Sequence, residues 1–217
     1  MASVIKAGNA TDGVQVTSDN TGILELKTGT GSGTTAVTIG TGQAVTFAGR
    51  TTNPTTISVG NATPATSGAG VTFPATQSAS TDANTLDDYE EGTFTPTATG
   101  ASTAGTTTYT VQAGFYTKIG RQVTVSIKLG YSAMTGTGTV NIGNLPFTSA
   151  NTTSLETVGS VMTQNLNWTG GTYLSTYIDV NQAVLNVYGS TDDGALSAQQ
   201  CVNETANYWI VHTYFTA

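Results

Sequence analysis

Charged residues are scarce in this chain of 217 residues, where they make up 9% against about a quarter in ordinary soluble domains. Thirteen acids and six basic residues give a net charge of −7, which disfavours nucleic acid and anionic membrane surfaces as partners. A single cysteine, Cys201, excludes an intrachain disulfide. The opening MASVIKAGNATDG lacks the apolar core of a secretion signal, and no apolar run approaches the ~20 residues of a membrane helix. These absences predict a chain that folds in a cytoplasm, without crosslinks and without a membrane.

Strong helix formers are also few, and no segment places apolar residues at the 3.6-residue spacing of a helix. The chain is instead rich in glycine, with 26 residues, and in threonine, which fills roughly a fifth of it. Threonine is β-branched and favours strands, whereas glycine, asparagine and serine supply turns. The composition therefore predicts an all-β chain. Lysines on edge strands prevent unwanted pairing with other chains, and this chain has few of them. We therefore expect assembly into a closed multimer that covers the strand edges.

Aromatic side chains are nearly absent from the N-terminal part of the chain. Residues 1–80 contain only Phe47 and Phe73, and the other fifteen lie in 89–217. Since each aromatic side chain buries ~150–250 Å² and dominates a core, only the C-terminal part can build a core of its own. Short apolar segments in the N-terminal part need strands from other chains beside them, which predicts an extended, intertwined trimeric shaft or anchor over 1–80, with a flexible linker as the alternative. These segments are 14–17, 23–27, 36–39, 44–47, 57–59 and 71–73.

The C-terminal part shows the two-residue period of half-buried strands. In RQVTVSIKL, Val123, Val125 and Ile127 face one way while Thr124 and Ser126 face the other. The segment 114–129 is predicted to be a β-hairpin, and further strands are expected at 93–99, 106–112, 138–143, 155–163, 172–180, 182–188 and 206–215. This spacing is typical of an antiparallel β-sandwich of jelly-roll type, which we predict over 93–217. Residues 76–92 show no strand pattern, so 81–92 is predicted to be an acidic connection between the two parts.

Residues able to carry catalysis are few and isolated. The only histidine, His212, lies in the strand YWIVHTYF, and we expect it to be an interface or packing residue. Cys201 has no basic neighbour, so we expect a buried or incidental thiol. Carboxylates cluster at 87–91 and 192–193, but a glycosidase needs two of them ~5–10 Å apart beside a sugar groove. We predict no enzyme activity, no cofactor and no metal site, with calcium binding by the 87–91 cluster as an open alternative. Trp168, in NLNWTGG, is the one candidate surface contact, and a place at the edge of the core is its alternative.

Three stretches between residues 84 and 147 carry a distinctive pattern. They are NTLDDYEEGTFTPTATG, TYTVQAGFYTKIGRQVTVSIKLGYS and GTGTVNIGNLPF. This pattern resembles a segment of tail-fibre and related virion proteins of tailed bacteriophages, and the opening VIKAGNATDGVQVTSDNTGILELKTGTG also resembles phage structural proteins. The resemblance implies a trimeric β-structured assembly with a globular knob. It further implies that Gly120 permits the hairpin turn, that Tyr116 and Ile119 pack on the hairpin, and that Pro146 closes a strand.

We therefore expect a homotrimeric virion protein, assembled in the cytoplasm of an infected bacterium. A tail fibre or appendage would bind other tail or baseplate proteins and contribute to host attachment through a surface glycan or protein. The alternative is a capsid decoration protein that trimerises on the head and stabilises it. The shaft-like N-terminal part favours the fibre, whereas the short chain favours the decoration protein.

Overall fold

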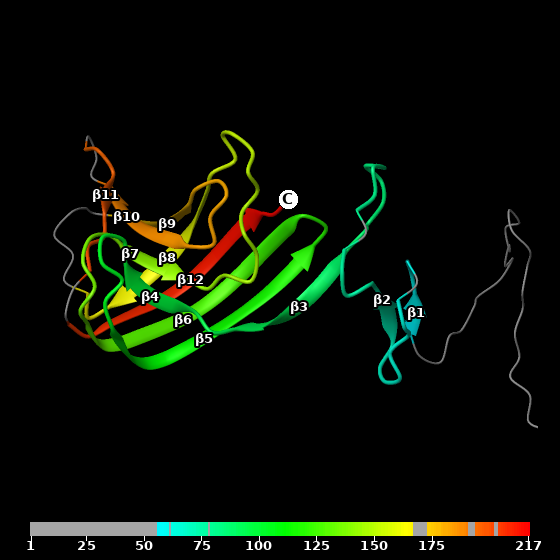
Figure 1. Cartoon of the computed structure of the whole chain (residues 1–217), viewed down its shortest axis with the longest axis horizontal. Coiled ribbons are helices and arrows are strands. Elements are labelled where there is room, and N and C mark those ends of the chain that lie inside the picture. The colour runs from blue at the N-terminus through cyan, green and yellow to red at the C-terminus, as the bar shows by residue number, and fades with distance from the viewer. Residues whose placement is uncertain (1–55, 61, 78, 167–172, 191–193, 202–203) are drawn as a thin grey trace, which may run out of the picture. The chain divides into compact units, whose positions relative to one another are not determined.

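The computed structural model describes residues 56–217, except residues 61, 78, 167–172, 191–193 and 202–203. The segments expected at 14–17, 23–27, 36–39 and 44–47, and with them most of the predicted shaft, lie outside the described residues. Every regular element in the described part is a β-strand (Figure 1). The predicted all-β class is therefore confirmed for this part of the chain.

Ten strands form one antiparallel sheet that curls on itself (Figure 1). Their order is β3-β5-β6-β12-β8-β9-β10-β7-β4, and β11 pairs with β10 beside this path. The first and last strands of this order, β3 and β4, are joined by only Thr95 and Pro96, so the two ends of the sheet are tied together. The strands are β3 (Tyr89–Phe94), β4 (Thr97–Gly100), β5 (Thr107–Ile119), β6 (Gln122–Met134), β7 (Val140–Gly143), β8 (Thr157–Gln164), β9 (Tyr173–Ile178), β10 (Leu185–Ser190), β11 (Ser197–Ala198) and β12 (Ala206–Phe215).

A single hydrophobic core fills the inside of the curl. Strand β6 turns every second side chain into it, as the alternation in RQVTVSIKL predicted, and β12 does the same beside it. Strands β4, β7, β9 and β10 close the core from the opposite side. Its buried side chains include Val123, Val125, Ile127, Leu129, Tyr131, Met134, Ile142, Ile178, Leu185, Val187, Tyr208, Ile210 and Tyr214.

The hairpin predicted over 114–129 is confirmed and is longer than expected. Its two strands, β5 and β6, each run for 13 residues and are joined by the two-residue loop Gly120–Arg121. Gly120 has φ 55, in the left-handed region that glycine enters without a steric cost. The segments expected at 106–112 and 114–119 are one strand, since irregular pairing between Thr108 and Val111 bends it without interrupting it.

The segment 76–92 was wrongly expected to contain no strand, because β3 begins at Tyr89. Charged side chains on both faces of β3 hide its two-residue period from a hydrophobicity pattern. The strand expected at 93–99 is divided into β3 and β4 by Pro96, which has no N–H to donate to a ladder.

The remaining expected strands are present, with ends shifted by up to three residues, and β12 has the predicted bounds. Nearer the N-terminus, β1 (Thr56–Ser58) and β2 (Gly70–Thr72) form a separate parallel pair within one residue of the segments expected at 57–59 and 71–73.

Candidate interaction surface

The three stretches that carry the phage-like pattern meet around one buried cation. Lys118, on β5, forms an ion pair with Asp88, and both residues are almost fully buried. Lys118 Nζ also donates to Gln77 Oε1 at 3.1 Å and lies 5.6 Å from the centre of the Phe147 ring. Asp88, Lys118 and Phe147 belong to the first, second and third stretch respectively. We call these residues, with Glu90, Gly92 and Tyr116, the motif cluster.

Tyr116 forms the aromatic part of the motif cluster. Its hydroxyl donates to the Glu90 carboxylate, and this hydrogen bond raises the pKa of Tyr116 to about 12. The Tyr116 ring meets the Phe147 ring edge-on, with 5.5 Å between ring centres. A Cβ at Gly92 would lie 2.8 Å from Tyr116, so glycine is what allows the ring to lie across β3. Tyr116, which is itself part of the hairpin, therefore packs against β3 and Phe147.

Two of the other roles implied by the resemblance are wrong. Ile119 is 52% exposed and does not pack on the hairpin, because its position in β5 points away from the core. Pro146 does not end the strand before it, since β7 stops at Gly143. The next residue, Asn144, has φ 60, which breaks the extended conformation first.

The other acids of the predicted connection also have partners within the chain. Asp87 accepts a hydrogen bond from the backbone N–H of Ser80 at 2.8 Å, which lowers the pKa of Asp87. Glu91 accepts from the hydroxyl of Tyr89 at 2.7 Å. Among the residues that the structure describes, no three His, Cys, Asp or Glu side chains are grouped to bind a metal ion. The acids at 87–91 thus attach their segment to β5 and to itself. The other acidic cluster, at 192–193, lies outside the described residues.

His212 is a core residue, 1% exposed, between two threonine hydroxyls. Its Nδ1 lies 2.8 Å from Thr176 Oγ1 and its Nε2 lies 2.8 Å from Thr157 Oγ1. Burial lowers the pKa of His212 to about 4, so the ring is neutral at pH 7. Cys201 is partly buried, which raises the pKa of its thiol and keeps it protonated. Trp168, the one candidate surface contact from the sequence, lies outside the described residues.

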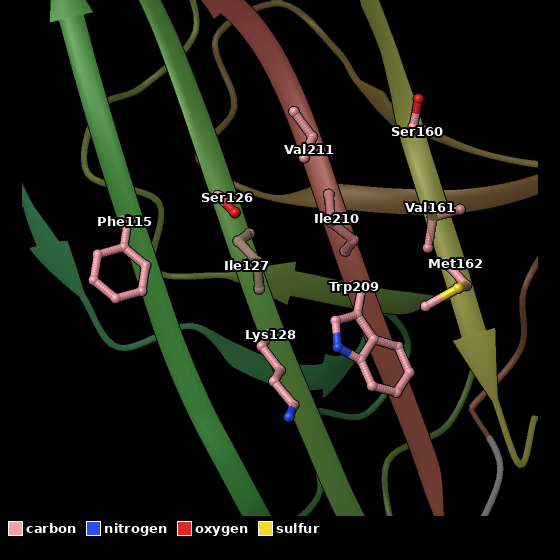
Figure 2. A pocket seen from close by; sticks show the side chains of 10 residues that line it. All are labelled: Phe115, Ser126, Ile127, Lys128, Ser160, Val161, Met162, Trp209, Ile210 and Val211. Carbon is pink, nitrogen blue, oxygen red and sulfur yellow. The ribbon is translucent and has the colours of Figure 1, made fainter.

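Exposed apolar side chains gather on the side of the sheet that faces away from the core (Figure 2). Four neighbouring strands, β5, β6, β12 and β8, carry them, and a shallow depression of about 430 Å³ runs across these strands. The exposed fractions are 59% for Phe115, 53% for Val211, 61% for Met162 and 72% for Val158. We call the outward side chains of these four strands the outer face. Its central members are Phe115, Thr124, Ser126, Lys128, Val158, Ser160, Met162, Trp209, Val211 and Thr213.

The pairing of the strands arranges the outer face in rows. One row runs from Phe115 to Ser126, Val211 and Ser160, and the next runs from Lys128 to Trp209 and then to Met162. Lys128 is the only charged residue at the outward positions of the four strands, and its Nζ lies 5.6 Å from the centre of the Trp209 ring. The outer face therefore combines apolar and hydroxyl side chains with one cation and no acid.

The outer face was not predicted as a site from the sequence. The signal was present in YWIVHTYF, where both alternating sets of side chains contain large apolar residues. Tyr208, Ile210 and Tyr214 are buried, whereas Trp209 and Val211 point outward. A strand with two apolar faces on a sheet with one core leaves one of these faces for solvent or for a partner.

Comparison with known protein families, with curated proteins and with solved structures returns no match to this chain. No helix of the described residues has the length and apolar character to cross a membrane.

Proposed function

We propose that this chain is a structural protein of a tailed-bacteriophage virion, a homotrimeric tail fibre or appendage that contributes to host attachment. In this proposal, residues 1–80 form the intertwined shaft or anchor and residues 93–217 form a knob that displays loops to the host surface. The chain has no enzymatic activity and acts through binding and assembly.

The observation that carries this proposal is the motif cluster. The phage-like pattern was found in three stretches separated along the chain, and its residues lie against one another in the fold: Asp88 against Lys118, and Tyr116 against Phe147. The contacts support the view that the pattern belongs to one structural unit, as the resemblance implies.

The form of the C-terminal domain agrees with a knob of jelly-roll type. One antiparallel sheet curls until β6 and β12 face β7, β9 and β10 across a single core. Such a domain keeps most of its backbone hydrogen bonds in long ladders and leaves loops at its ends for recognition. This arrangement supports a rigid module at the tip of an appendage.

Four titratable groups that could serve catalysis are engaged within the chain. His212 is neutral and enclosed by Thr157 and Thr176, and Cys201 carries a protonated thiol. The carboxylates of Asp88 and Glu90 are engaged by Lys118 and Tyr116 instead of facing an open groove. Neither a general base nor a nucleophile is presented to a substrate by these groups.

Immunogold electron microscopy of intact particles, with an antibody against residues 93–217, tests the proposal. Gold at the tail or baseplate of the phage that encodes this chain is the expected result. Gold distributed over the head would instead establish the alternative, a capsid decoration protein in which the N-terminal strands clamp the shell. Purified particles that carry no label would overturn both assignments.

A further inference from the structure

We propose that the outer face is the surface on which further copies of this chain pack in the oligomer. This inference rests on the proposed trimer and identifies the surface through which it forms. Its starting point is the exposure of Phe115, Val158, Met162 and Val211, each more than half exposed on adjoining strands. Contiguous apolar patches of this kind on a soluble chain mark a surface that is covered in the working assembly.

The distribution of charge points to another copy of the chain as the partner. The chain has a net charge of −7, so two copies repel each other over most surfaces that carry acids. The outward positions of β5, β6, β12 and β8 carry no acid and only one cation, Lys128. Copies can therefore approach through these four strands without bringing carboxylates together. The acids beside them are Glu91 on β3, which borders Phe115, and Glu156 and Asp179 near Tyr177 of β9, and these would lie at the rim of the contact. Nucleic acid would require several cations, and a basic protein would require acids, and the outer face has neither.

The polar side chains of the outer face also suit burial. They are mainly hydroxyls, such as those of Ser126 and Ser160. The hydroxyl oxygens of Thr124 and Thr213 lie 2.9 Å apart across neighbouring strands and are hydrogen-bonded. A hydroxyl is both donor and acceptor and can rotate to meet a partner, and its transfer from water costs far less than that of a charge. The one cation, Lys128, lies within the face, where its amino group is 5.6 Å from the centre of the Trp209 ring and its aliphatic stem adds apolar surface.

The size of the outer face is adequate for an interface. Four strands at a spacing of ~4.8 Å, each with about eight residues at ~3.3 Å, give a flat area of roughly 500 Å². Side-chain relief adds to this area, and Tyr173 on the next strand, β9, is 70% exposed. A specific interface buries about 800 Å² on each partner. The outer face with its neighbouring strand approaches that value.

Two methionines provide an internal test of whether the outer face is covered. Met162 lies on the outer face and is 61% exposed in the single chain, whereas Met134 is 1% exposed in the core. Brief oxidation of the full chain with dilute peroxide, followed by peptide mass spectrometry, measures both rates, and light scattering of the same sample gives the mass. In the wild-type oligomer we expect Met162 to be oxidised nearly as slowly as Met134, because a neighbouring copy covers it.

Variants that place an acid on the outer face should uncover Met162. In Val211→Glu, and in Val158→Glu as a second variant, we expect Met162 to be oxidised roughly tenfold faster than in the wild type, since thioether oxidation follows access to the sulfur. Both positions point outward, so circular dichroism should be unchanged. Leu196→Glu is the matched control, because Leu196 is 68% exposed but lies outside the four strands. It should behave as the wild type.

The outcomes separate the inference from the proposed function. A wild-type oligomer in which Met162 reacts as fast as in Val211→Glu would show that the outer face is free, which overturns the inference and leaves the trimer standing. A wild-type monomer would overturn both. A monomer with a protected Met162 would show that another segment of the same chain covers the face. Protection of Met162 that appears only on addition of host glycan or protein, with no oligomer present, would also contradict the inference.

Discussion

At the scale of single residues, His212 owes its properties to the two threonines beside it. Thr157 and Thr176 supply one hydroxyl to each ring nitrogen, so the neutral ring can donate from one nitrogen and accept at the other. Burial then makes the protonated form costly, which lowers the pKa of His212 to about 4. The sequence predicted a packing role for this histidine but contained no indication of its partners, since Thr157 and Thr176 are far from it along the chain.

The lowered pKa of His212 predicts a loss of stability on mild acidification. Between the ordinary pKa of 6.5 and the folded value of about 4, the unfolded chain binds a proton that the folded chain does not. The contribution of His212 to the free energy of unfolding should therefore be fully present above pH 7, and the free energy of unfolding should fall by about 2 kcal/mol by pH 5. Urea unfolding at the two pH values measures the difference, and His212→Gln should remove most of it. Equal pH dependence in the variant and the wild type would contradict the assignment.

For the Asp88–Lys118 ion pair, we expect a single substitution to lower the free energy of unfolding more than the double substitution does. Lys118→Met should lower the free energy of unfolding by about 3–5 kcal/mol, because the Asp88 carboxylate would remain buried without its cation. Adding Asp88→Asn to Lys118→Met should restore most of this loss, since no buried charge then remains. Chemical denaturation of both single variants and the double variant tests the coupling. Additive losses would show that the two residues do not depend on each other.

At the scale of elements, the alternation of side chains could be predicted from the sequence, but its direction could not. In β6, apolar residues alternate with polar ones, so the inner side was evident, and the structure confirms it. In β12 both sets are apolar, and only the pairing with β6 and β8 places Tyr208 inside and Trp209 outside. Strand β3 was missed because Glu90 and Glu91 interrupt the pattern, although their bonds to Tyr116 and Tyr89 help to fix the strand.

The turn of the β5–β6 hairpin gives a prediction at this scale. Gly120 has φ 55, and Gly120→Val should cost about 1–2 kcal/mol because a β-branched residue is strained in the left-handed region. Gly120→Asn is the matched control, since asparagine enters this region readily and should retain most of the stability. Thermal unfolding of the two variants provides the comparison. Equal losses would mean that backbone conformation is not the reason for glycine at this turn.

At the scale of the whole molecule, the composition was sufficient to predict the all-β class. The order of the strands in the sheet could not be predicted from it. β12 lies between β6 and β8 although long stretches of chain separate them, and β4 closes the sheet beside β7. Such pairings depend on complementary packing of distant segments, which a local pattern does not encode. The motif cluster has the same origin: its residues were visible in the sequence, but the contact of Asp88 with Lys118 was not.

The outer face links the fold to the proposed role. The low charge of the chain predicted a multimer, and the structure adds a specific acid-free apolar surface across β5, β6, β12 and β8. A surface of this kind suits the trimeric assembly that we propose. Oligomerisation is the property on which the tail-fibre and decoration proposals both depend.

The mass of the full chain in solution, measured by light scattering after size-exclusion chromatography, tests this claim most directly. The proposal predicts a species of three times the 22.1 kDa chain mass that persists on dilution. A species of 22.1 kDa at every concentration would contradict it, because neither a fibre nor a decoration trimer could then form from this chain alone.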